Sequence, residues 1–417
     1  MKAWTCAGYG ADGNPGDAIA KLEMSEIAIP APGAGQVQVK ISHAAVNPID
    51  WKLFSGGLHG ICPCTFPYVP GFDVAGTVSA VGEGERRVPP PRPGRWRYFR
   101  DVDPCSPEAR KSDPIRHPLP PPPPPPPRTS HRPGHLRPPS LTPDPPRTHL
   151  TSPPGVSDFA VGDAVCVDLG LVETCVDPAP AQGCGGAFAE YAVAPASLVA
   201  KSGTLNGPTA AALPLAGLTA YQGLFTKSAR TFAGEPLGDV KSGDKVLVLG
   251  GATLVGSYAI QLAKNAGATV ACTASTNVTS DGRTKMALCE SLGADVVIDY
   301  KSSSWSERLA GQEYDMIYDC VGSNDDWVAS SKVLKKGGLF LSIANFAADP
   351  AANEACVFKN FLLKSDGADL AELVAMVEQG KLKVTFDSTV KMADAPAALT
   401  KSFKSENAGK IVVAVAE

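Results

Sequence analysis

The chain has 417 residues, of which 44% are hydrophobic and 19% charged, so most of it is expected to form an ordinary globular protein of two or three domains. The 39 prolines do not fit this composition, because 24 of them, with 12 of the 15 arginines, lie between Glu85 and Gly155. This stretch carries a net charge of +7 and leaves −11 on the other 346 residues. The overall charge of −4 is therefore an average, which excludes reading the composition as the property of one fold.

The N-terminal residues Met1–Gly10 begin directly in a strand-like pattern, without the charged and apolar regions of a secretory signal. Eleven cysteines are scattered along the chain with no C-x-x-C spacing, which is typical of free thiols in a reducing compartment. The apolar stretch Val246–Ile260 is too short to cross a bilayer. We therefore expect a cytoplasmic protein, with no membrane span and no nucleic-acid partner.

Residues Glu85–Gly155 are expected to be a disordered insertion rich in Pro and Arg. Pro120–Pro127 is an unbroken run that favours polyproline II, a conformation that SH3 and WW domains bind. The flanking segments Gly71–Gly84 and Val156–Val165 would join into a strand–turn–strand unit that is complete without the insertion. We interpret the insertion as a retained intron or a gene-model error, and a docking arm for SH3 or WW domains is the alternative.

The strongest motif lies at Asp244–Gly267, where an apolar strand at Lys245–Leu249 runs into a Gly-rich turn and then a helical pattern at Ser257–Ala266. Such a unit directs backbone N–H groups and a helix dipole at a diphosphate. The expected phosphate-binding residues are Gly250, Gly251, Thr253, Val255 and Gly256. Further strands are expected within 268–274, 291–300, 314–322 and 336–343, and together they predict a doubly wound parallel sheet.

The residues after the second strand indicate which nucleotide binds. NAD enzymes place a carboxylate there to hold the ribose hydroxyls, whereas this chain has Ser275 and Thr276. Arg283 and Lys285 follow, and small hydroxyls with nearby cations suit the 2′-phosphate of NADPH. Asp281 is the alternative, because a loop that folds back would let its carboxylate bind NAD.

Several motifs, taken in order, resemble the zinc-independent quinone oxidoreductases and enone (alkenal) oxidoreductases of the medium-chain dehydrogenase/reductase superfamily, which include zeta-crystallin. They are AAVNPIDWK (44–52), FPYVPGFDVAGTVSAVG (66–82), FAVGDAV (159–165), GGAFAEYAV (185–193), LPLAGLTAYQGL (213–224), the glycine turn, LGADVVIDY (292–300) and AGKIVV (408–413). The resemblance implies a homodimer in which each chain is an α/β protein with a GroES-like catalytic domain and a Rossmann domain. The implied boundaries are 1–84 and 156–200, completed by 346–417, for the catalytic domain, 85–155 for the insertion and 201–345 for the Rossmann domain. Similarity to plant envelope-associated proteins makes the plastid a second location.

The resemblance also indicates that no metal site is present. Zinc-dependent relatives have a cysteine near the position of Asn47 and a Gly-His-Glu where this chain has Gly71-Phe72-Asp73. Phenylalanine cannot bind a metal, and catalytic zinc needs three protein ligands. The pair Cys62 and Cys64 has no pair of histidines nearby to complete a site.

Without zinc, the implied reaction is transfer of hydride from NADPH to a hydrophobic quinone, or to the C=C bond of an α,β-unsaturated carbonyl, where charge delocalises onto oxygen. By resemblance, Asn47 and Thr219 lie beside the nicotinamide and its ribose. Asp50 and Lys52 share the motif of Asn47, and Lys52 would stabilise the enolate oxygen or relay a proton; a salt bridge between these two is the structural alternative. The remaining cofactor-binding candidates are Tyr300, Val321, Gly322 and Lys410.

One departure from the family concerns Thr253, which stands where a glycine is usual. Its side chain could crowd the diphosphate or require a backbone conformation that β-branched residues avoid, or its hydroxyl could donate to a phosphate oxygen. This departure supports a second hypothesis, a catalytically weak NADPH-binding or structural protein of the same fold. A third hypothesis is a scaffold that recruits SH3 or WW domains through Pro120–Pro127.

Overall fold

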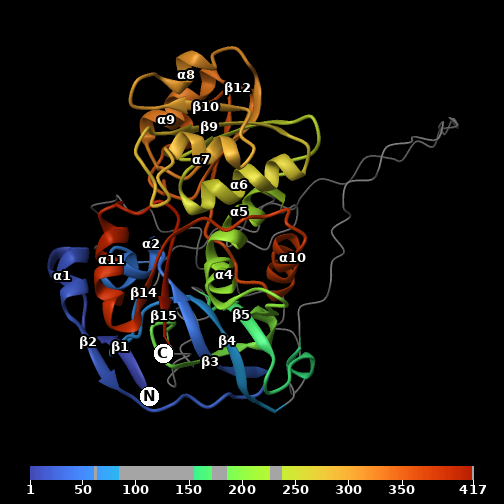
Figure 1. Ribbon diagram of the computed structural model, residues 1–417. Coiled ribbons are helices and arrows are strands. Elements are labelled where there is room, and N and C mark those ends of the chain that lie inside the picture. The colour runs from blue at the N-terminus through green and yellow to red at the C-terminus, as the bar shows by residue number, and fades with distance from the viewer. Residues whose placement is uncertain (61–62, 84–154, 171–185, 226–236, 416–417) are drawn as a thin grey trace, which may run out of the picture. The chain divides into compact units, whose positions relative to one another are not determined.

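The computed structural model describes residues 1–60, 63–83, 155–170, 186–225 and 237–415, which belong to one compact unit (Figure 1). The predicted disorder of the insertion and the proposed docking run Pro120–Pro127 lie outside the described residues. Among the helices of the described ranges, none combines the length and hydrophobicity that a membrane span needs. The cysteines of these ranges are all free thiols, namely Cys6, Cys64, Cys166, Cys272, Cys289, Cys320 and Cys356.

One half of the unit is built on a largely antiparallel sheet with the order β14-β15-β3-β4-β5-β7, in which β6 also pairs with β3. In the first part of β3 every second residue is buried, namely Val37, Val39 and Ile41, because successive side chains of a strand point to opposite faces. The strands are β3 (Gln36–Ala45), β4 (Asp73–Val81), β5 (Ala164–Asp168), β6 (Tyr191–Pro195), β7 (Val199–Lys201), β14 (Phe386–Lys391) and β15 (Lys410–Ala414). A separate antiparallel pair consists of β1 (Lys2–Cys6) and β2 (Leu22–Glu26).

The two strands that flank the insertion are hydrogen-bonded to each other. β4 and β5 are antiparallel, with Asp73 opposite Asp168 and Thr77 opposite Ala164. Beyond the ladder, the Val78 N–H donates to the carbonyl of Asp163 at 2.9 Å. The prediction that these segments form one strand–turn–strand unit is confirmed at the level of strand pairing.

The other half is a parallel sheet with the order β10-β9-β8-β11-β12-β13, which confirms the predicted doubly wound sheet (Figure 1). Its strands are β8 (Lys245–Leu249), β9 (Thr269–Ala274), β10 (Val296–Asp299), β11 (Tyr314–Asp319), β12 (Leu334–Ser342) and β13 (Val357–Asn360). The chain builds outward from β8 to β10, then returns to the other side of β8 with β11. Parallel sheets bind ligands at this reversal of strand order, beyond the carboxyl ends of the strands.

Helices cover both sheets. They are α1 (Pro15–Ala20), α2 (Pro48–Phe54), α4 (Gly207–Ala212), α5 (Pro214–Phe225), α6 (Leu254–Asn265), α7 (Lys285–Ser291), α8 (Trp305–Arg308), α9 (Asn324–Ala329), α10 (Gly367–Glu378) and α11 (Ala395–Phe403). Nearly every residue of α5 is buried, as expected for a helix that is apolar on all sides. α5 and α6 pack into the same hydrophobic core as β8 and β9, so they are fixed against the parallel sheet.

Candidate active site

The ends of three strands bring Asn47, Asp73 and Lys410 together. β3 ends at Ala45, which lies opposite Asp73, the first residue of the antiparallel strand β4. Lys410 is the first residue of β15, and this strand is also antiparallel to β3. Asn47 follows β3 by two residues and precedes the first turn of α2. The pairing of the strands therefore collects an amide, a carboxylate and an ammonium group at one end of the sheet.

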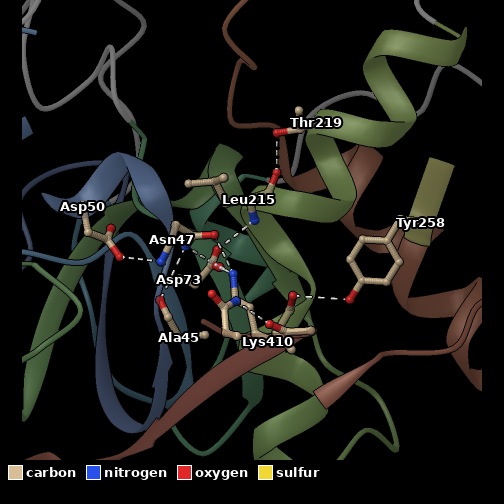
Figure 2. A network of polar contacts seen from close by, with 11 residues as sticks. Ala45, Asn47, Asp50, Asp73, Leu215, Thr219, Tyr258 and Lys410 are labelled. Atoms are coloured by element: carbon tan, nitrogen blue, oxygen red, sulfur yellow. Dashed lines mark hydrogen bonds and ion pairs between the residues drawn. The ribbon is translucent and has the colours of Figure 1, made fainter. Parts of the chain in front are cut away.

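These three side chains form a buried polar network (Figure 2). Lys410 Nζ donates to Asn47 Oδ1 and to Asp73 Oδ2, at 2.6 Å each, and Asn47 Nδ2 donates to the same Asp73 oxygen at 2.8 Å. Asn47, Asp73 and Lys410 are 2%, 0% and 2% exposed. Burying a charge is costly unless it is paired and hydrogen-bonded, and here the ammonium and the carboxylate satisfy each other. Lys410 was predicted to bind cofactor, and in the structure its ammonium is bonded to these two protein partners.

Asp50 adds a second buried carboxyl group to the network (Figure 2). Its Oδ2 accepts from the backbone N–H of Asn47 at 2.7 Å and caps α2, while its Oδ1 has no hydrogen-bond partner. Complete burial raises the pKa of Asp50 well above its usual range, and the negative charges of Asp73 and Asp168 raise it further, against the opposing effect of Lys410. Asp50 therefore keeps its proton to a higher pH than an exposed aspartate does.

The predicted alternative of a salt bridge between Asp50 and Lys52 is wrong. Asp50 fixes the start of α2 through the N–H of Asn47, and residues two apart on a helix lie on different faces. The Lys52 ammonium instead lies 5.6 Å from the centre of the Trp51 ring, within the range of a cation–π contact. Partial desolvation lowers the pKa of Lys52. Tyr68 packs against the hydrophobic core of this half.

Thr219 lies on α5 and is linked to the network through the start of that helix (Figure 2). The N–H of Leu215 donates to Asp73 Oδ1 at 2.7 Å, and the Thr219 hydroxyl donates to the Leu215 carbonyl, also at 2.7 Å. The Thr219 carbonyl accepts from the hydroxyl of Tyr318, on β11, at 2.8 Å. The helix that carries Thr219 is thus bonded both to the start of β4 and to the parallel sheet.

The glycine turn between β8 and α6 has the geometry of an anion-binding loop. Gly250 adopts φ +81°, a conformation that favours glycine. A Cβ on Gly256 would lie 2.3 Å from the Gly250 carbonyl oxygen, so the close approach of turn and helix requires glycine there too. The turn brings Gly250 beside Val321, since a Cβ on Gly250 would lie 3.2 Å from Val321 Cγ2. The ends of β8 and β11 therefore meet at the reversal of strand order.

Thr253 fits this turn without strain. It has an extended backbone, with φ −69° and ψ 160°, and its Oγ1 accepts from the Gly256 N–H at 3.0 Å as the N-cap of α6. The expectation of an unfavourable β-branched conformation is therefore wrong, because the left-handed residue of the turn is Gly250. Thr253 is the cap that satisfies one of the free donors at the start of the helix.

The candidate residues for the adenosine end of the cofactor follow the end of β9, and they differ in exposure and in hydrogen bonding. Ser275 is buried and Thr276 is exposed. Arg283 is bound to the protein itself, with Nη2 at 2.5 Å and Nε at 2.9 Å from Asp281 Oδ2, and with Nη1 at 2.9 Å from the Ser291 hydroxyl. Asp281, the predicted alternative for NAD, is the partner of this pair, and its pKa is lowered chiefly by Arg283.

Two lysines remain near this end of β9. The Lys285 N–H donates to the Asn277 carbonyl at 2.8 Å, and Lys301 Nζ donates to Asn277 Oδ1 at 3.0 Å. Tyr300 precedes Lys301 and is 55% exposed. The sequence prediction did not name Lys301, which follows Tyr300 directly after the end of β10.

A buried carboxylate shapes the turn after β11. Asp319 Oδ1 accepts from the N–H groups of Val321 and Gly322 at 2.8 and 3.1 Å, and its Oδ2 accepts from the Ser342 hydroxyl at 2.6 Å. Val321 is 57% exposed. Asp319, absent from the sequence prediction, thus holds the predicted cofactor residues Val321 and Gly322 in a defined turn.

The sequence prediction also assigned no role to Asp73, although it is the acidic residue at the start of an otherwise uncharged strand. Phe72, which replaces the histidine of zinc-dependent relatives, is a buried core side chain. In the parts of the chain that the structure describes, no group of three or more His, Cys, Asp or Glu side chains could hold a metal ion.

Comparison with known proteins agrees with this architecture. The family model for the alcohol dehydrogenase GroES-like domain matches residues 33–95, and that for zinc-binding dehydrogenases matches residues 292–413. The chain is 31% identical to 2-methylene-furan-3-one reductase of Solanum lycopersicum, over 93% of this chain and 71% of the relative. It is 29% identical to the chloroplastic NADPH-dependent alkenal/one oxidoreductase of Arabidopsis thaliana, over 99% of this chain and 79% of the relative.

The fold is that of the quinone oxidoreductase from Coxiella burnetii, with a TM-score of 0.66 and 22% identity over 100% of this chain and 99% of the other. A GroES-like domain joined to a Rossmann-like parallel sheet defines the class of medium-chain dehydrogenases/reductases. Within that class, the chain belongs to the family of quinone oxidoreductases and alkenal/one oxidoreductases.

Proposed function

We propose that this oxidoreductase uses NADPH to reduce quinones, or the C=C bond of α,β-unsaturated carbonyls, without zinc. The observation that carries the proposal is the meeting of Gly250 and Val321 at the reversal of strand order in the parallel sheet. Dinucleotides bind at this position in doubly wound sheets. The first N–H groups of α6 lack acceptors within the helix and suit the diphosphate, with Gly250, Gly251, Thr253, Val255 and Gly256 around it.

The preference for NADPH rests on the charges beyond β9. Because Asp281 is paired with Arg283, no unpaired carboxylate is offered to the ribose hydroxyls by that loop. We propose that Ser275, Thr276 and Lys285 bind the 2′-phosphate together with Lys301, and that Arg283 holds the loop in shape. The exposed ring of Tyr300 would cover the adenosine. The NADPH-dependent alkenal/one oxidoreductase among the relatives supports this choice.

The chemistry of the proposed reaction determines the roles of the nicotinamide-side residues. Reduced nicotinamide, when bound, supplies the hydride. Asn47 and Thr219 would hold the nicotinamide and its ribose, while Asp50 keeps Asn47 in place through its backbone N–H. Lys52 would stabilise the negative charge that develops on the substrate oxygen, or relay a proton to the product. A conjugated acceptor delocalises this charge itself, so the reaction needs no metal ion as Lewis acid.

The experiment follows oxidation of NADPH and of NADH by the full-length protein with quinones, enones and saturated aldehydes as acceptors. We expect turnover with quinones or enones, faster with NADPH, and unchanged after dialysis against a zinc chelator. Faster turnover with NADH would overturn the choice of cofactor, and loss of activity in the chelator would overturn zinc independence. Tight NADPH binding without turnover on any acceptor would favour the weakly catalytic alternative, for which the unstrained Thr253 gives no support.

We also propose a homodimer, to be checked by sedimentation velocity, and cytoplasm and plastid as the two candidate locations, to be separated by fractionation. The Arabidopsis thaliana relative is chloroplastic.

A further inference from the structure

Asp73 makes contacts that reach both residues proposed to hold the nicotinamide end of the cofactor. Its Oδ2 accepts from the Asn47 side-chain amide at 2.8 Å, and its Oδ1 accepts from the Leu215 N–H at 2.7 Å. The Leu215 carbonyl in turn accepts from the Thr219 hydroxyl. One buried carboxylate therefore connects the loop after β3 with the helix α5 (Figure 2).

Lys410 fixes the orientation of the Asn47 amide in this arrangement. Its ammonium can only donate, so the Asn47 atom that it contacts at 2.6 Å must be the amide oxygen. The Asn47 nitrogen then faces Asp73, which can only accept as a carboxylate. The amide cannot flip without setting two donors or two acceptors against each other.

From these contacts we propose that Asp73 is a positioning residue, which, with Lys410 as its counter-ion, sets the places of Asn47 and Thr219 for the nicotinamide. This inference rests on the proposed function, because it assumes that Asn47 and Thr219 hold that part of NADPH. It assigns to Asp73 no contact with substrate or cofactor. The effect of Asp73 is confined to the nicotinamide end of the cofactor. The contacts of Asp73 lie where β3 ends, where β4 and β15 begin, and at the start of α5.

The test removes the positioning contacts while keeping the buried charge balanced. D73N alone would leave the buried ammonium of Lys410 without its counter-ion, which is strongly destabilising. The double variant D73N/K410M removes both charges and keeps an oxygen at position 73 that accepts from the Leu215 N–H. In this variant Asn47 loses both of its charged partners, and the ammonium no longer fixes its orientation, so its amide can flip and accept from the new amide nitrogen at position 73.

The matched control is D387N/K401M, which removes another ion pair with a buried carboxylate, where Lys401 Nζ lies 2.5 Å from Asp387 Oδ2. For each variant, dissociation constants are measured for NADPH and for adenosine 2′,5′-bisphosphate, which lacks the nicotinamide. Thermal unfolding, kcat and KM are recorded in parallel. N47A and the triple variant N47A/D73N/K410M complete a thermodynamic cycle.

We expect D73N/K410M to weaken NADPH binding about five- to tenfold, the effect of losing roughly one hydrogen bond, and to leave adenosine 2′,5′-bisphosphate binding unchanged. The kcat should fall on the order of tenfold or more, because misplaced reacting groups lose rate. The triple variant should bind NADPH like N47A, since D73N keeps the acceptor for the Leu215 N–H and the double variant therefore disturbs only the contacts of Asn47. The control should match the wild type in both affinities.

Equal weakening of both ligands, or NADPH affinity and kcat that match the wild type, would overturn the proposal. An additive effect in the triple variant would also overturn it. Failure of the wild type to bind either ligand would contradict the proposed function itself, and the role of Asp73 would be lost with it. Binding of NADPH by the wild type without turnover leaves the affinity cycle as the decisive measurement.

Discussion

The guanidinium of Arg283 is bound to the carboxylate of Asp281, with Nη2 2.5 Å from Oδ2, in the loop that joins β9 to α7. In the sequence, Asp281 was the candidate for binding NAD and Arg283 a candidate for binding NADPH. Because the two side chains pair with each other, each balances the charge of the other. We therefore propose that Lys285 and Lys301 discriminate between NADPH and NADH.

Substitution of these cations should separate their roles. We expect K285A and K301A each to raise the KM for NADPH about tenfold, with little change for NADH, because a charge-assisted hydrogen bond to phosphate is lost. R283A should change the KM for NADPH and for NADH less than K285A or K301A changes the KM for NADPH, because Arg283 is bonded to the protein. A larger loss of NADPH selectivity in R283A than in K301A would contradict this order.

The buried Asp50 should make stability depend on pH. Burial raises its pKa in the folded protein above that in the unfolded chain, so its contribution to folding is fully present below about pH 4 and is lost as the pH rises toward the folded pKa. In D50N the group stays neutral. We therefore expect the free energy of unfolding of D50N, minus that of the wild type, to increase by about 1.4 kcal/mol per pH unit in this window.

Urea unfolding of the wild type and of D50N between pH 4 and pH 9 measures this difference. A difference that is constant over the range would mean that Asp50 has a similar pKa in both states. D163N is a suitable control, because Asp163 is ion-paired with Lys201 and its pKa is lowered.

The N-cap of α6 should be measurable in stability. T253A removes the oxygen that accepts from the Gly256 N–H and should cost about 1 kcal/mol, whereas T253S keeps the oxygen and should match the wild type. T284A removes the corresponding N-cap of α7, which does not follow a glycine turn. It therefore serves as a control that measures the energy of an N-cap alone. Thermal unfolding gives the cost, and a T253A protein as stable as the wild type would contradict it.

Lys52 should give the reaction an alkaline limit. Desolvation lowers its pKa, so the ammonium form is lost at a lower pH than for an exposed lysine. We expect kcat to fall on the alkaline side as Lys52 deprotonates, and the fall to move to higher pH in K52R, since arginine stays charged. K52M should be about tenfold slower or more at neutral pH. A pH profile identical in wild type and K52R would exclude Lys52 as the titrating group.

Removal of Glu85–Gly155 should leave the fold and cofactor binding intact. The strands β4 and β5 already pair as neighbours, and shortening the connection between them lowers the entropy cost of closing it by about 2 kcal/mol. We expect the deleted protein to unfold at an equal or higher temperature and to bind NADPH like the full chain. An insoluble deletion variant would show that the insertion contributes to the fold, and transcripts that skip its codons would support its origin as a retained intron.

Local patterns were sufficient to predict the parallel sheet and its glycine turn. β8 coincides with the expected strand at Lys245–Leu249, and β11 and β10 lie within their expected ranges. α6 begins at Leu254, earlier than the expected Ser257, because the Thr253 cap was not recognised in the sequence. These features depend on neighbouring residues, so a single sequence contains the information.

The network around Asp73 could not be predicted in the same way. Asp73 and Lys410 are 337 positions apart, and only the pairing of β3 with both β4 and β15 brings them together. The pairing of Arg283 with Asp281 depends on the path of a short loop, which composition does not determine. The sequence shows which residues carry charge at these two sites. The tertiary fold determines which of these charges pair with each other.

The pairing of Thr77 with Ala164 also bears on the rate of folding. These partners are 87 positions apart in the chain and would be 16 apart without the insertion. With the insertion in place this pairing is a long-range contact, and proteins dominated by long-range contacts fold more slowly. During refolding, β4 must therefore remain unpaired with β5 until a long segment has closed, which prolongs the time that an apolar strand edge is open to other chains.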